Sequence, residues 1–310
     1  MSSNGLTMNR WSGRCPMFAT AFAMSLLGTL AGCATTPAQP DAAAAQTALS
    51  SSAAADARAK AAEARAKGDG DTALRLYVEA ADHDPSDAES FYQIGSIYDE
   101  RKNGALAARA YTRAVQNNPE HALALEGLGL RYFADRQLEQ ARPLLTRAVA
   151  VEPALWRSHN ALGLIADSLG EHETAAAHFA AALQVRPDSA SILNNRGYSR
   201  YLAGDLDAAE RDYRAALTFD PGYSQAWQNL GLVFARRGDY QRALATLARV
   251  VSKHVAANDV GYIAMLSGDY AAAEQLFADA LRLSPRYYQT ADENFAELRR
   301  RRAAVAAAAP

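Results

Sequence analysis

The chain has 310 residues, of which 49% are apolar and 21% are charged, and its formal net charge is −2 at pH 7. This balance is that of an ordinary folded chain and excludes an intrinsically disordered protein. The near-neutral charge gives no electrostatic reason to expect nucleic acid as a partner, because nucleic-acid binding needs a basic surface.

Residues 1–32 are predicted to be an export signal. Arg10 and Arg14 supply a positive amino-terminal region, and an apolar run follows from Pro16 to Leu30. The run is shorter than the roughly 20 residues that a membrane-spanning helix needs, so we interpret it as a cleaved signal peptide.

The apolar run ends in Leu30-Ala31-Gly32-Cys33. This sequence resembles the lipobox of bacterial lipoproteins, which implies that Cys33 is acylated and becomes the first residue after cleavage. Ala34, where an aspartate would signal retention, implies the outer membrane of a diderm bacterium, on its periplasmic side. More than one acyl chain anchors a protein durably. The alternative is an ordinary cleaved signal with an incidental cysteine.

Residues 33–53 are rich in alanine, serine and proline and show no apolar periodicity beyond alanine. We expect a lipidated flexible tether, which as a random coil spans on the order of 25 Å. The folded body is predicted to begin at residue 54.

From there a pattern recurs every 34 residues. Prolines recur at this spacing at Pro85, Pro119, Pro153, Pro187 and Pro221. Glycines do so at Gly95, Gly129, Gly163, Gly197 and Gly231, and alanines at Ala73, Ala107, Ala141, Ala175, Ala209 and Ala243. A fixed period of this length predicts a repeat architecture.

Within one period, residues 88–121, two amphipathic helices are predicted. The first carries an apolar stripe at helical spacing, namely Phe91, Ile94, Gly95 and Tyr98, and the second carries Ala107, Tyr111 and Ala114. We expect Gly104 to end the first helix in the left-handed conformation and Pro119 to end the second. Ser86 and Glu89 are interpreted as a capping box.

These residues resemble the tetratricopeptide repeat (TPR) family. The resemblance implies an all-α, right-handed solenoid of helix-turn-helix units. Seven repeats are predicted over residues 54–287, the sixth being four residues shorter than the others, and residues 288–310 are expected to form a capping helix with a frayed tail. The basic run Arg299–Arg302 is interpreted as a solvated helix end, or alternatively as a contact for anionic lipid or an acidic partner.

The sequence shows no catalytic, metal or cofactor site. The six histidines form no metal-binding pattern, and the one dinucleotide-like glycine motif, residues 68–73, has no strand before it. We therefore predict no cofactor, no metal and no enzymatic activity.

A partner-binding groove is predicted along the first helices of the repeats, which line the inner curve of this architecture. Amides recur at the fifth repeat position, at Asn160, Asn194, Gln228 and Asn258, and aromatic side chains lie nearby at Phe133, Tyr198, Tyr201 and Tyr262. Such amides can bond the backbone of an extended peptide, and aromatic rings can anchor apolar side chains. The alternative is that the amides are solvated or bond neighbouring helices.

Arg196 and Arg200 replace residues that are apolar in the repeat pattern. Because buried guanidinium groups need partners, we expect them either to extend into solvent or to pair with Asp205, Asp207 or Glu210. The functional alternative is a basic notch for an acidic partner.

Three segments, Trp227, residues 258–262 and residues 284–288, resemble the TPR lipoproteins of tight-adherence (Flp) pilus loci, the TadD type. The resemblance implies a scaffold in pilus secretion or assembly, with a secretin or pilus components as partners. The alternatives are a pilotin-like lipoprotein of type IV pili or an adaptor for cell-wall enzymes. A hypothesis from a different functional class is a hydrolase or a protein that binds a small ligand.

Overall fold

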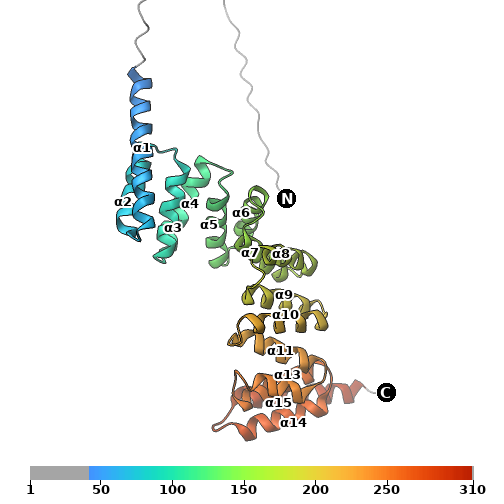
Figure 1. Cartoon of the computed structure of the whole chain (residues 1–310). Helices are drawn as coiled ribbons and strands as arrows, with labels where there is room; N and C mark the ends of the chain where they lie inside the picture. The colour runs from blue at the N-terminus through green and yellow to red at the C-terminus, as the bar shows by residue number, and fades with distance from the viewer. Residues whose placement is uncertain (1–41, 309–310) are drawn as a thin grey trace, which may run out of the picture. The chain divides into compact units, whose positions relative to one another are not determined.

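The computed structural model describes residues 42–308, and over this range the chain forms fifteen α-helices and no strand (Figure 1). The all-α prediction is confirmed. The predicted signal peptide, Cys33 and the first part of the predicted tether lie outside the described residues. The helices are α1 (Ala42–Ala66), α2 (Gly70–His83), α3 (Ala88–Glu100), α4 (Gly104–Asn117), α5 (Ala122–Ala134), α6 (Leu138–Val151), α7 (Trp156–Ser168), α8 (His172–Val185), α9 (Ala190–Leu202), α10 (Leu206–Phe219), α11 (Ser224–Arg236), α12 (Tyr240–Leu247), α13 (Lys253–Leu266), α14 (Tyr270–Leu283) and α15 (Gln289–Ala308).

From α3 onward the helices alternate between a first and a second helix of a hairpin. Each first helix packs against its own second helix, and each second helix packs against the next first helix. First helices of successive hairpins also contact each other, from α3 with α5 through to α13 with α15. The first helices therefore lie side by side, and side chains at one repeat position come close in space across several repeats.

The recurring glycine of a first helix leaves a space that a large side chain of the second helix of the same hairpin occupies. A Cβ atom placed on Gly163 would lie 2.6 Å from Cε1 of Phe179, and one on Gly197 would lie 2.8 Å from Cε1 of Tyr213. Phe179 and Tyr213 are completely buried. The recurring glycine is thus a packing requirement, because any side chain there would occupy the space of the ring.

The turn between the two helices of a hairpin uses the left-handed conformation, but not always with glycine. Gly170 and Gly204 adopt it in two hairpins, whereas Lys102 (φ 58°) and Arg136 (φ 62°) adopt it in two others. The prediction that Gly104 ends α3 is wrong. Gly104 begins α4 instead, because the preceding residue, Asn103, caps that helix.

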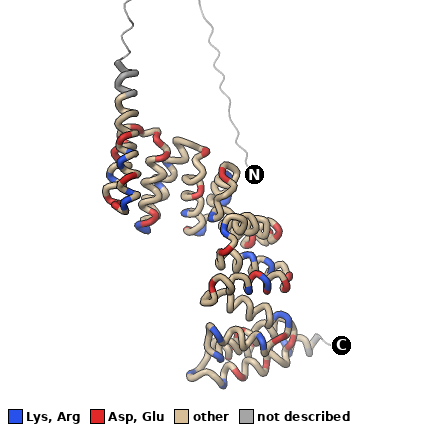
Figure 2. Tube along the Cα trace, in the orientation of Figure 1, with Lys and Arg blue, Asp and Glu red and all other residues tan. Residues whose placement is uncertain are grey.

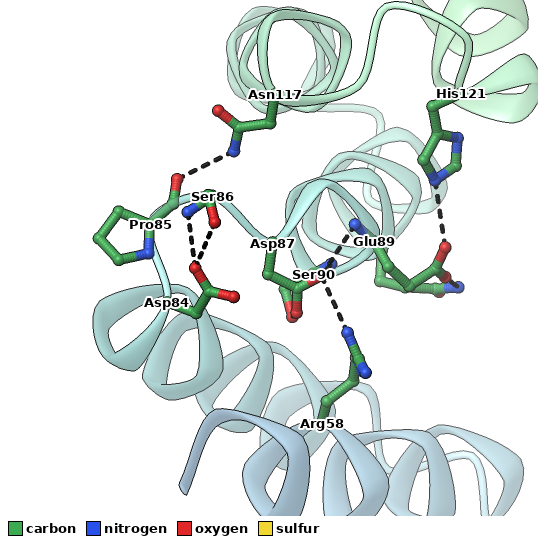
Figure 3. Close-up of polar contacts among 10 residues, drawn as sticks. Arg58, Asp84, Pro85, Ser86, Asp87, Glu89, Ser90, Asn117 and His121 are labelled. Carbon is green, nitrogen blue, oxygen red and sulfur yellow. Dashed lines mark hydrogen bonds and ion pairs between the residues drawn. The ribbon is translucent and has the colours of Figure 1, made fainter. Parts of the chain in front are cut away.

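The predicted capping box at Ser86 and Glu89 is not formed. Asp87 is the cap of α3, and its carboxylate accepts from the backbone N–H groups of Glu89 (3.1 Å) and Ser90 (3.4 Å) (Figure 3). Ser86 bonds to the Asp84 carboxylate instead. A carboxylate one residue further along takes the cap because it is the stronger acceptor and suits the positive end of the helix.

Three polar contacts around the start of α3 join neighbouring hairpins (Figure 3). They are Arg58 to Asp87 (3.0 Å), His121 to Glu89 (3.1 Å) and the side-chain amide of Asn117 to the carbonyl of Pro85 (2.9 Å). His121 accepts the backbone N–H of Ala124 at Nδ1, so its Nε2 carries the proton that bonds Glu89. The bond from His121 is the main reason that the pKa of Glu89 is lowered.

Both ends of the described chain are more helical than expected. α1 begins at Ala42, so the segment 42–53 is helical rather than a flexible tether, as its many alanines, the best helix formers, allow. α15 continues to Ala308, so residues 303–308 are not frayed.

The short sixth repeat has a shorter second helix: α12 has 8 residues, whereas α10 and α14 have 14. None of the helices described is long and apolar enough to cross a bilayer.

Candidate partner-binding groove

The four predicted amides lie on successive first helices, α7, α9, α11 and α13, but three of them bond between repeats. The carbonyl oxygens accept from an asparagine one repeat further on, in the pairs Asn195 to Asn160 (3.0 Å), Asn229 to Asn194 (2.9 Å) and Asn294 to Asn258 (2.9 Å). Asn194 and Asn258 are only 1% and 4% exposed. These three amides therefore tie neighbouring helices together, which is the alternative that the sequence left open, and the buried Asn194 and Asn258 are not accessible to a peptide.

The exception in this series is Gln228, which is exposed. In the next repeat the position that supplies the donor elsewhere is Asp259, and a carboxylate has no hydrogen to donate. Asp259 instead accepts from the side-chain amide of its neighbour Asn258 (3.2 Å). The series of amide pairs is therefore interrupted between α11 and α13.

Two adjoining pockets occupy this interruption. One, of about 520 Å³, is lined by Leu232, Asn258, Asp259, Tyr262, Ile263 and Asn294. The other, of about 250 Å³, is lined by Tyr201, Arg236, Ile263, Leu266 and Ser267. Ile263 lines both. We call this pair of pockets the α11–α13 groove.

The predicted aromatic residues divide between this groove and the core. Tyr198 and Tyr201 stack with ring centroids 6.3 Å apart, and Tyr201 and Tyr262 line the two pockets of the groove. Tyr198 is 44% exposed and Tyr262 is 41% exposed. Phe133 instead packs against a separate core cluster of α6 and α7, so the structure does not bring it to the tyrosines.

Arg196 and Arg200 pair with a residue that the sequence analysis did not name. Arg196 donates Nε and Nη2 to the two oxygens of Asp212 at 2.9 and 2.7 Å, and Arg200 donates to Asp212 at 2.7 Å. Asp212 is 3% exposed, so the two cations balance a buried carboxylate. The expected partners are engaged elsewhere: Asp205 caps α10, and Asp207 and Glu210 pair with Arg237.

A sequence signal for this pairing existed. Asp212 occupies a repeat position that holds Ala110, Leu144, His178 and Thr246 in other repeats, so the one acid there falls in the repeat with the two arginines. Asp212 thereby neutralises one of the two positive charges of the basic notch. The same holds at the end of the chain, where Arg300 and Arg301 pair with Glu297 and Arg302 pairs with Glu274. Figure 2 shows acidic and basic positions interspersed along the helices rather than gathered in one stretch.

Two further features lie outside the predicted groove. A pocket of about 690 Å³ over α2, α3 and α4 is lined by apolar residues such as Val78 and Phe91 and by Arg113, and sequence reasoning did not find it. His159 and His178 place their Nδ1 atoms 3.1 Å apart, and burial, helped by His159, lowers the pKa of His178. No group of three or more metal-ligating side chains occurs in residues 42–308.

The comparisons with known proteins agree with this architecture. The family model described as tetratricopeptide repeat matches six overlapping stretches, residues 58–122, 92–150, 126–190, 160–224, 194–259 and 229–288. No curated protein matches the chain.

Among solved structures, the chain is similar to a tetratricopeptide repeat protein from Parabacteroides merdae, with 17% identity, a TM-score of 0.52, and 80% of this chain and 98% of that chain covered. It is also similar to a chain of the Cut9–Hcn1 hetero-tetramer, with 16% identity, a TM-score of 0.53, and 77% and 48% covered. YrrB, described as a TPR protein with an unusual peptide-binding site, matches with 22% identity, a TM-score of 0.48, and 55% and 88% covered.

Proposed function

The chain belongs to the tetratricopeptide repeat family, and we propose that it is a non-catalytic scaffold that binds a segment of another protein in the α11–α13 groove. The observation that carries this proposal is the coincidence of pockets and exposed aromatic side chains. Tyr262, which is 41% exposed, lines the larger pocket, and Tyr201, which stacks on the exposed Tyr198, lines the smaller one. Aromatic anchors beside a pocket supply much of the binding energy of protein interfaces.

A binding assay with matched variants tests this proposal. The full membrane-anchored chain is crosslinked in cells and its partners are identified, beside a variant carrying Tyr198→Ala, Gln228→Ala and Tyr262→Ala. All three side chains are exposed, so the fold should survive. Leu169→Ala, at a 57% exposed turn position away from the groove, is the control. We expect the triple variant alone to lose its partners. Recovery of the same partners by the triple variant would refute the groove.

The finer proposal places this scaffold in the cell envelope. We propose an outer-membrane lipoprotein, anchored through acylated Cys33 and facing the periplasm, that acts in assembly of a tight-adherence pilus beside a secretin. Support comes from the lipobox-like sequence at Cys33 and from the resemblance to TadD-type lipoproteins. Cys33→Ser should release the protein from the outer-membrane fraction and abolish labelling by a clickable fatty acid. A deletion strain that still displays normal surface pili would exclude the pilus role.

A further inference from the structure

The α11–α13 groove carries two charged groups without an oppositely charged partner. Asp259 lines the larger pocket, and among the described residues no lysine, arginine or histidine forms an ion pair with it. Arg236 lines the smaller pocket, where its guanidinium lies 4.9 Å from the centroid of Tyr201 and donates to the backbone carbonyl of Tyr201, but it pairs with no carboxylate in residues 42–308. Arg301, which interacts electrostatically with Tyr262 of the groove, pairs with Glu297.

The local surroundings make the unpaired carboxylate costly for the free protein. Asp259 is half-buried between apolar and amide side chains, and burial raises its pKa. A partly buried carboxylate without a cation is destabilised, and a cation supplied by a ligand would relieve that cost. The neighbouring Tyr262 ring and the Leu232 and Ile263 side chains form walls that suit the apolar stem of a lysine or arginine.

The spacing of the two charges follows from helix geometry. Asp259 and Leu266 lie seven residues apart on α13, about 10 Å along the axis at about 1.5 Å per residue. Arg236 shares its pocket with Leu266, so it lies near that level. A chain in the polyproline II conformation advances about 3.1 Å per residue with three residues per turn, so side chains three residues apart lie on the same face, about 9 Å apart.

We propose that the α11–α13 groove selects a peptide segment in the polyproline II conformation that carries a basic side chain and an acidic side chain three residues apart, with apolar residues between them. The basic side chain binds Asp259, the acidic side chain binds Arg236, and the apolar residues cross Ile263. This inference rests on the proposed peptide-binding function and specifies the charge pattern of the partner. The acidic group of the groove can be traced to the sequence, because Asp259 occupies the repeat position that holds Asn195 and Asn229 in other repeats.

Fluorescence anisotropy with defined peptides tests the charge pattern on the full chain in detergent micelles. The first probe is the labelled peptide Ala-Arg-Ala-Leu-Glu-Ala, acetylated and amidated so that it has no terminal charges. The second is its isomer Ala-Arg-Glu-Leu-Ala-Ala, which has the same composition but adjacent charges. We expect the spaced peptide to bind about tenfold more tightly than the isomer, the difference that one charge-assisted hydrogen bond typically makes.

Two variants assign the charges. Asp259→Asn keeps the shape of the side chain, so the fold should be retained, and it should weaken binding of the spaced peptide about tenfold and remove the preference over the isomer. Arg236→Gln should do the same through the acidic end, whereas Arg286→Gln, outside both pockets, should change nothing. Equal binding of the two peptides, no measurable binding of either, or an Asp259→Asn variant that keeps the preference would overturn the inference. None of these results bears on the crosslinking assay with Tyr198 and Tyr262, so the two proposals can fail separately.

Discussion

Replacement of Gly163 by alanine tests the packing on which the repeat depends. The new Cβ would lie 2.6 Å from Cε1 and 2.8 Å from Cζ of Phe179, where ordinary carbon contacts are about 3.5–4 Å. Phe179 is 0% exposed and has no free space to enter. Overpacking of this kind costs about 1–3 kcal/mol, and the better helix propensity of alanine returns about 1 kcal/mol. We therefore expect the free energy of unfolding to fall by about 1 kcal/mol.

A second background isolates the clash. In Phe179→Ala the ring is absent, so Gly163→Ala should there stabilise the protein by about 1 kcal/mol, through helix propensity alone. Gly70→Ala is the control in the wild-type chain, because its Cβ would meet only a terminal nitrogen of Arg101 at an ordinary 3.7 Å. Urea denaturation gives the free energies, and hydrogen exchange of α7 and α8 shows whether the loss is local, as expected when repeats contact only their neighbours. The same destabilisation by Gly163→Ala in both backgrounds would refute the argument.

Three further substitutions follow from single contacts. Tyr213→Phe removes a buried hydroxyl that finds no hydrogen-bond partner within residues 42–308, so urea denaturation should show a gain of about 1 kcal/mol, whereas Tyr111→Phe, which loses a bond to a carboxylate, should show a loss of similar size. Arg136→Gly should stabilise by about 1 kcal/mol, because its φ of 62° is strained for any residue with a Cβ; a gain from Arg136→Ala would contradict this. Asp259→Asn should allow its amide to donate to Gln228 and should raise stability near neutral pH by about 1 kcal/mol. Burial raises the pKa of Asp259, so the folded chain keeps this proton to a higher pH than the unfolded chain does, and the advantage of Asp259→Asn should shrink as the pH falls through that raised pKa; a constant advantage across that range would contradict it.

The predicted groove shows where reasoning from the sequence stops. The row of amides follows from repeat spacing, because the same position of successive first helices must recur in space. Which of these amides face a partner does not follow from the spacing. Asn194 and Gln228 occupy the same repeat position, yet Asn194 is only 1% exposed whereas Gln228 lies at the surface. The difference depends on the residue opposite in the next repeat, which is Asn229 for Asn194 and Asp259 for Gln228.

The sequence alone determined the hairpin period, the recurrence of glycine and alanine at fixed positions of the repeat, and the all-α class that residues 42–308 adopt, because these depend on spacings within one helix or one repeat. The tertiary structure decided the partner of Arg196 and Arg200, the inter-repeat bonds of the asparagines, and the opening of the groove between α11 and α13. Each of these depends on how side chains from different helices meet. Asp212 is neutralised by arginines of the neighbouring helix α9, whereas Asp259 meets no cation among the described residues.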